Sequence, residues 1–140
     1  LDVASTLISR VGDVTFAKDK HAFFGIRVAD TIDVEDGGRV VNSRGQENEV
    51  GTMGQEADWV DYNGVVADQA VGVTLMHHPS NPRSPYFVRD YGTFLSNFTM
   101  NEPYVLRDGK SLLQRFRVLV HEDRAEEVDI VGYHAEFCAA

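Results

Sequence analysis

The sequence predicts a mainly β fold, an antiparallel β-sandwich that is followed by one C-terminal α-helix. Short apolar runs recur along the chain, alternate with polar residues at a period of two, and are bounded by Gly, Asp and Asn. Only the last segment changes to a helical period. The chain has 140 residues, a usual length for one domain, and no linker or repeat divides it. Residues 1–140 are therefore expected to form a single β-sandwich domain.

Strand signals follow one another from the N-terminus. Residues 1–11, 14–16, 23–28 and 71–77 carry the alternating apolar pattern, and a Gly37-Gly38 turn leads into a further strand at 39–42. Residues 44–55 contain three glycines and few large apolar side chains, which predicts a long surface loop. Residues 104–106 and 111–121 predict a β-hairpin, because Asp108-Gly109 between them suits a turn with positive φ.

The predicted C-terminal helix begins after Asp123, whose side chain can cap it, and Glu126 completes a capping box. An apolar stripe follows at spacings of three, four and three residues, the period of an amphipathic helix that packs on a sheet. This stripe consists of Val128, Val131, Ala135 and Cys138.

The charge and hydropathy of the chain exclude several classes of partner. Thirteen Lys and Arg against 22 Asp and Glu give a net charge of −9, and a field of this sign repels phosphate backbones, so no nucleic acid is expected to bind. No run approaches the about 18 consecutive apolar residues that a membrane-spanning helix needs, so no transmembrane segment is expected.

The single Cys138 cannot form an internal disulfide and is expected to be a buried thiol. The chain starts without Met and inside a predicted strand, so its localisation stays open.

The densest polar cluster follows the predicted strand at 71–77. Three of the four prolines lie within residues 79–85. Because proline fixes φ, we expect a stiff loop that presents His78, Asn81 and Arg83 to a ligand. The alternative is that the prolines only end the strand and the polar side chains cap loop carbonyls.

Two histidines at the end of this strand, His77 and His78, point to opposite faces and so cannot easily bind one metal ion together. A site that joins His78 to the distant His21, Asp61 or His121 is the alternative, and we expect neither a metal nor a cofactor. His77 fits better as a histidine that is hydrogen-bonded within the core.

A second cluster, residues 58–64, contains the only tryptophan. Trp59 and Asp61 share one face of a strand, and two interpretations are open. Either the indole stacks on a sugar ring whose hydroxyls bond to the carboxylate, or Trp59 is a core residue and Asp61 bonds to loop amides. Arg27 lies among apolar neighbours and needs an anionic partner, either as a structural ion pair or as an anion clamp. Arg89 offers another guanidinium after the proline loop.

These clusters resemble the methane oxygenase PmoA family. The similar segments are residues 24–29, 38–43, 57–62, 78–83 and 88–92, and the resemblance extends from about residue 12 to residue 133. It implies a β-sandwich that forms the C-terminal part of a longer family domain, and a ligand related to sugars. Methane oxidation is not expected, because the chain lacks the membrane spans of such an enzyme. The residues carried over from the family motifs are Arg27, Asn42, Asp61, His78, Asn81 and Arg83.

The sequence thus leads us to expect an enzyme that epimerises or cleaves a carbohydrate or polyol by acid–base chemistry. His78 would be the general acid or base, because an unperturbed imidazole titrates near neutral pH. The expected catalytic residues are His78, Arg27 and Asp61, and the expected substrate-binding residues are Asn42, Trp59, Asn81, Arg83 and Arg89.

Two alternatives stay open. In the first, the chain is a non-catalytic carbohydrate-binding module in which Trp59 and Tyr62 form the stacking platform. In the second, it is a structural fragment with an exposed sheet edge, through which homo-oligomers form.

Overall fold

Two antiparallel sheets stack face to face in the computed structural model, which describes residues 1–140. The larger sheet has the strand order β1-β10-β6-β5-β4, and its edge strands are therefore β1 and β4. Its strands are β1 (Asp2–Ile8), β4 (Arg39–Asn42), β5 (Trp59–Val66), β6 (Gln69–His77) and β10 (Ser111–Glu122). The smaller sheet has the order β3-β8-β7, with β3 (Phe24–Arg27), β7 (Tyr86–Arg89) and β8 (Thr93–Ser96).

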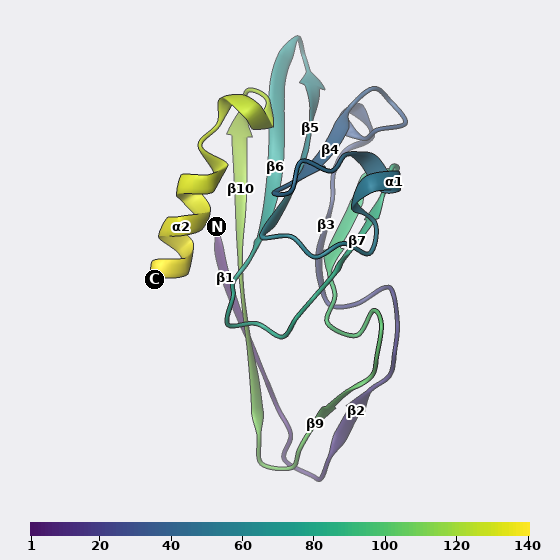
Figure 1. The fold of residues 1–140 in the computed structure, drawn as a ribbon, viewed down its shortest axis with the longest axis vertical. Coiled ribbons are helices and arrows are strands. Elements are labelled where there is room, and N and C mark those ends of the chain that lie inside the picture. The colour runs from purple at the N-terminus through teal and green to yellow at the C-terminus, as the bar shows by residue number, and fades with distance from the viewer.

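The remaining elements lie around these sheets. A two-stranded ribbon of β2 (Val14–Phe16) and β9 (Tyr104–Leu106) extends beyond one end of the sandwich (Figure 1). Helix α2 (Ile130–Ala139) covers the larger sheet on the face opposite to the smaller sheet (Figure 1). The short helix α1 (Asn48–Thr52) and two 3-10 turns, η1 (Asp30–Ile32) and η2 (Ala125–Glu127), lie in connections. No helix is both long and apolar enough to cross a membrane.

The inner faces of the two sheets form the main core. Val60, Tyr62, Leu75 and Phe116 of the larger sheet are fully buried against residues of the smaller sheet, among them Phe94. Phe116 stacks on Phe24 of β3, with the ring centroids 4.6 Å apart. Alternation in β5 and β6 therefore places one set of side chains in this core and the other set on the face that α2 covers.

The prediction of a mainly β, antiparallel fold with a C-terminal helix is confirmed. The predicted strands at 14–16 and 39–42 have the observed bounds, and the strand at 71–77 begins two residues earlier than expected. The segment at 44–55 is not a simple loop, because it contains α1, in which the Thr52 hydroxyl donates to the Asn48 carbonyl at 2.7 Å.

The predicted hairpin at 104–121 is wrong in its pairing. The turn at Asp108-Gly109 exists, and Gly109 has φ of +69°. However, β9 pairs with β2, whereas β10 pairs with β1 and β6. The turn is tied to a distant segment, because Asp13 accepts from the Asp108 amide at 2.9 Å and pairs with Arg107 at 2.6 Å. Each arm of the turn therefore pairs with a different strand rather than with the other arm.

The predicted phase of the C-terminal helix is also wrong. Asp123 has a positive φ of 69°, and the capping contact forms one residue later, where the Glu127 carboxylate of η2 accepts from the Arg124 backbone amide at 3.1 Å. Helix α2 starts after Asp129, whose carboxylate accepts from the Gly132 amide at 2.9 Å. Because the 3-10 turn interrupts the helical period, the buried residues of α2 are Ile130 and Phe137, and Val131 of the predicted stripe is 69% exposed.

We expect Phe116→Ala to lower the free energy of unfolding by about 3–5 kcal/mol, because it removes the ring that joins the two sheets and leaves a cavity. The matched control is Val120→Ala on the same strand and face, since Val120 is 73% exposed. It is expected to change stability by about 0.5 kcal/mol or less. Urea denaturation measures both, and equal losses in the two variants would contradict this description of the core.

Candidate functional site

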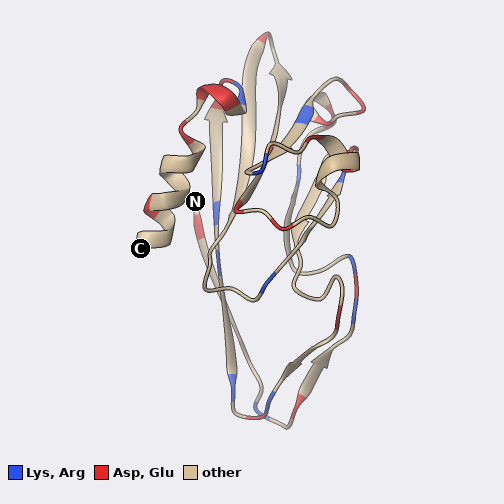
Figure 2. Cartoon of the chain, viewed as in Figure 1, with Lys and Arg blue, Asp and Glu red and all other residues tan.

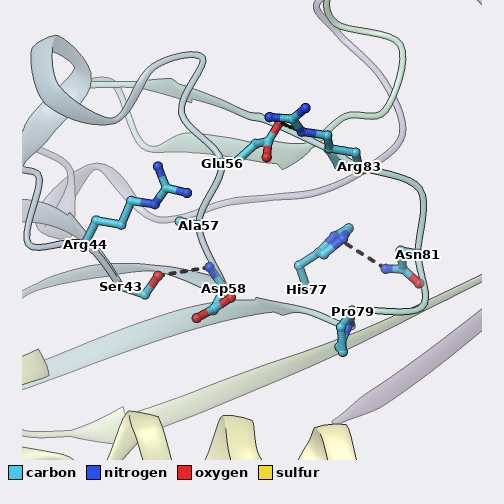
Figure 3. Close-up of a pocket in the computed structure, with 10 residues that line it drawn as sticks. Ser43, Arg44, Glu56, Ala57, Asp58, His77, Pro79, Asn81 and Arg83 are labelled. Atoms are coloured by element: carbon cyan, nitrogen blue, oxygen red, sulfur yellow. Dashed lines mark hydrogen bonds and ion pairs between the residues drawn. The ribbon is translucent and has the colours of Figure 1, made fainter.

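A polar hollow of about 410 Å³ opens where β6 ends. Its walls come from the turn after β4, the segment before β5, the last residue of β6 and the proline loop that follows (Figure 3). Ala57 and Pro79 are the only lining residues without a polar side chain. The lining residues are Ser43, Arg44, Glu56, Ala57, Asp58, His77, Pro79, Asn81, Arg83 and Ser84.

His77 forms one wall of the hollow, opposite Ser43 and Arg44 (Figure 3). Its Nδ1 lies 3.0 Å from the Ser96 hydroxyl and 3.4 Å from Nδ2 of Asn81. An amide Nδ2 can only donate, so Nδ1 is assigned as an acceptor and the ring proton is assigned to Nε2. No protein group bonds to Nε2. The imidazole, which lines the hollow, therefore keeps one N–H donor that no protein group uses.

The same environment keeps His77 uncharged. Burial, followed by the neighbouring His78 and His134, lowers the pKa of His77 to about 4. The ring is therefore a neutral hydrogen-bond donor at pH 7 rather than a cation.

Asn81 holds the proline loop in place. Its Nδ2 donates to the Arg115 carbonyl at 2.8 Å, and its Oδ1 accepts from the Arg115 amide at 2.7 Å. The side chain thereby continues the pairing of β10 beyond the end of β6. Both ends of the amide are engaged, so the contribution of Asn81 to the hollow is to fix the position of its wall.

The opposite wall is fixed by Asn42. This buried amide accepts through Oδ1 from the backbone N–H groups of Arg44 and Gln46, at 3.0 and 3.1 Å. The turn thus held presents Ser43, whose hydroxyl accepts from the Asp58 amide at 2.9 Å.

The charged side chains of the hollow fall into two groups. Arg83 forms an ion pair with Glu56, in which its guanidinium is largely exposed. Neither the Arg44 guanidinium nor the Asp58 carboxylate has an ion-pair partner within the protein. These two groups are therefore free to bond to a ligand.

His78 lies outside the hollow, on the opposite face of the larger sheet. It is 6% exposed and packs edge-on against Phe137 of α2, with the ring centroids 5.1 Å apart. Its Nδ1 lies 2.7 Å from the Ser80 hydroxyl, and its Nε2 lies 3.1 Å from Arg115 Nη1. Burial, followed by the charge of Arg115, lowers the pKa of His78.

Asp61 is fully buried on that same outer face and is the centre of a separate network. Its carboxylate accepts from Asn63 Nδ2 and Thr74 Oγ1, each at 2.7 Å, and lies 2.7 Å from His121 Nε2. Gly72 lies between these strands, and a Cβ there would be 2.3 Å from His121 Cε1. The absence of a side chain at Gly72 lets the imidazole reach the carboxylate.

Arg27 and Arg89 lie on the smaller sheet, away from both the hollow and the outer face of the larger sheet. Both guanidinium groups lie over the Tyr91 ring, at 5.5 and 5.3 Å from its centroid. Arg27 is mostly exposed and lies 3.9 Å from Asp30, and Arg89 bonds to Glu49 at 3.0 Å.

The structure therefore brings together only Asn81 and Arg83 among the predicted site residues. The expectation that His78, Arg27 and Asp61 face one hollow with them is wrong, because strand alternation and sheet membership separate the three. Asn42 supports the hollow from behind, and Trp59 lies in an adjoining groove. From the sequence, His77 was expected to be a hydrogen-bonded residue of the core. Its position as the last residue of β6, directly before the proline loop, could have indicated that it lines a site at the end of the strand.

Comparison with known proteins gives one match. The model of DUF6807, a family of unknown function, matches residues 1–135. No curated protein and no solved structure matches the chain. The resemblance to the methane oxygenase PmoA family is wrong, since the family that covers the motif-bearing segments is a different one.

The Asp61–His121 pair predicts a pH dependence of stability. Burial opposes a charge on His121, but the hydrogen bond to Asp61 and the charge of Asp61 outweigh it and raise the pKa of His121. Because the pKa of His121 is higher in the folded state, protonation of His121 stabilises the fold. This stabilisation is complete at pH values below the pKa in the unfolded state, about 6.5, and it is lost as the pH rises through the pKa in the folded state.

We therefore expect the free energy of unfolding to fall from about pH 6.5 upward in the wild type, and to fall less in His121→Gln. Glutamine keeps a donor for Asp61 but does not titrate. His21→Gln, at a mostly exposed site, is the control and should keep the wild-type profile. Chemical denaturation at a series of pH values measures this, and parallel profiles for wild type and His121→Gln would refute it.

Proposed function

We propose that this chain, which belongs to DUF6807, binds a small polyhydroxylated molecule, a carbohydrate or polyol, in the polar hollow at the end of β6. The observation that carries the proposal is the neutral His77, whose Nε2–H has no protein partner, in a hollow whose lining also includes the unpaired Arg44 guanidinium and Asp58 carboxylate.

The mixture of groups in the hollow supports a hydroxyl-rich ligand. A hydroxyl both donates and accepts, so it can bond to Asp58 as an acceptor and to Arg44 or His77 as donors. The two arginines and two carboxylates of the lining cancel in charge, which favours a neutral polar molecule over a strongly charged one. The volume lies within the range of about 300–1,000 Å³ that small-molecule sites occupy.

The walls are held before any ligand arrives. Asn81 and Asn42 fix the two sides through bonds to backbone groups. A site built in this way loses less conformational entropy on binding, which increases affinity.

The same hollow also supports acid–base chemistry, the reaction class expected from the sequence. Epimerisation or elimination begins when a base removes a proton from a carbon next to a carbonyl or carboxyl group. Asp58 would accept that proton. His77 Nε2–H would donate a hydrogen bond to the oxygen on which negative charge develops, as a neutral imidazole can.

Binding without catalysis is the second candidate, but not through the stacking platform that the sequence suggested. Tyr62 is fully buried in the core between the sheets. Trp59 lies on the opposite face of β5 by strand alternation. The two rings therefore cannot form one surface.

We expect Arg44→Ala and His77→Leu each to weaken glycan binding by about tenfold or more, since each removes a donor worth about 1.5 kcal/mol in the hollow. Arg27→Ala is the matched control for Arg44→Ala, because both arginines are exposed but Arg27 lies on the smaller sheet. A glycan array identifies a ligand, and calorimetry measures the affinities. The proposal is rejected if no glycan binds, or if Arg27→Ala is the more damaging change.

The catalytic step has its own test. In D2O, a bound sugar should exchange the proton next to its carbonyl group for deuterium, and Asp58→Asn should stop this exchange while binding persists. Mass spectrometry of the recovered sugar measures the exchange. Binding without exchange in the wild type would leave a binding protein rather than an enzyme.

A further inference from the structure

A groove of about 270 Å³ adjoins the hollow on the outer face of the larger sheet. Trp59, the only tryptophan of the chain, lines this groove together with Val41 and Ala125. Trp59 is partly buried and packs against the cluster beneath α2, which restricts the motion of its ring. An aromatic ring in this setting offers a rigid apolar face to a ligand.

Polar groups surround this ring. Arg39 forms ion pairs with Glu47, at 2.6 Å, and with Glu126 of η2. The acidic segment of η2 is visible beside the end of β10 (Figure 2). A rigid aromatic face bordered by carboxylates and a guanidinium matches the two surfaces of a sugar ring, whose C–H groups are apolar and whose edge carries hydroxyls.

Ser43 belongs to both depressions. Its backbone N–H donates to the Trp59 carbonyl at 3.1 Å, and its hydroxyl accepts from the Asp58 amide at 2.9 Å. The residue that separates the hollow from the groove is thus bonded to one wall of each. The two depressions keep a fixed spacing around the end of β4.

We propose that the Trp59 groove is a second subsite, which binds the next unit of a sugar chain whose first unit occupies the hollow. This inference rests on the proposed function and narrows its ligand to an oligosaccharide. The unit in the hollow is bound by hydrogen bonds, and the unit in the groove is bound by stacking on Trp59. Stacking on Trp59 therefore increases affinity only for a ligand that is long enough to extend from the hollow beyond Ser43 into the groove.

The fluorescence of Trp59 reports directly on the groove, because the chain has no other tryptophan. The probes are a length series of one sugar identified on the array: its monosaccharide, disaccharide and trisaccharide. Calorimetry measures binding, and emission spectra are recorded in the same titrations. We expect the monosaccharide to bind without changing the emission of Trp59, and the disaccharide to bind about tenfold more tightly with a clear shift or quenching.

Variants separate stacking from folding. Trp59→Ala should remove the gain from the second unit and leave monosaccharide affinity unchanged, whereas Trp59→Phe should keep part of that gain. Tyr133→Ala is the control for loss of an exposed aromatic ring elsewhere, on α2, and should keep the full gain. Thermal melting of each variant identifies any that fail to fold, in which case the fluorescence of the wild type decides alone.

The possible outcomes separate this inference from the proposed function. If disaccharide and monosaccharide bind equally, or if the disaccharide leaves the emission of Trp59 unchanged, the second subsite is refuted and binding in the hollow stands. If no member of any glycan series binds, the proposed function fails, and the second subsite fails with it.

Discussion

Two hydrogen bonds between the Asn81 side chain and the Arg115 backbone, at 2.8 and 2.7 Å, determine the shape of the polar hollow. Strand β6 ends at His77, which pairs with Phe116 of β10. Residues 111–115 of β10 lie beyond this pair and have no partner in β6. The Arg115 carbonyl accepts from the His78 backbone amide at 3.3 Å as well as from Asn81 Nδ2, and the Arg115 amide donates to Asn81 Oδ1, so the proline loop lies against β10. His77 lines the hollow beside this loop, where burial lowers its pKa to about 4 and its Nε2 has no protein partner.

The alternation of side chains in β6 assigns different roles to adjacent histidines. His77 points to the inner side and lines the hollow, and His78 points to the outer side and packs against α2. The Asp61–His121 pair is also on the outer side, where Gly72 makes room for it. The outer face therefore carries both the contact of His78 with α2 and the Asp61–His121 pair, and the hollow opens where β6 ends.

Local patterns predicted the strands and the fold class well, because period-two alternation reflects burial on one face. They did not predict pairing partners, since β9 pairs with β2 and β10 with β1 and β6, and the turn between them contacts Asp13, a residue far away in the sequence. The same limit applies to the site. The proline loop was predicted, and alternation already separated His77 from His78, but only the fold shows which face opens into a hollow. Arg44 and Asp58 join it through the turn that Asn42 caps.

The side-chain resonances of His77 report both the protonation of its ring and its contact with a ligand. Long-range ¹H–¹⁵N correlation spectra of the labelled protein distinguish the two neutral tautomers and the charged ring. We expect His77 to carry its proton on Nε2, to stay neutral down to its pKa of about 4, and to show a shifted Nε2 resonance when a glycan binds. A His77 that is charged at about pH 6, close to an ordinary histidine, or an Nε2 signal that a bound glycan leaves unchanged, would contradict this expectation.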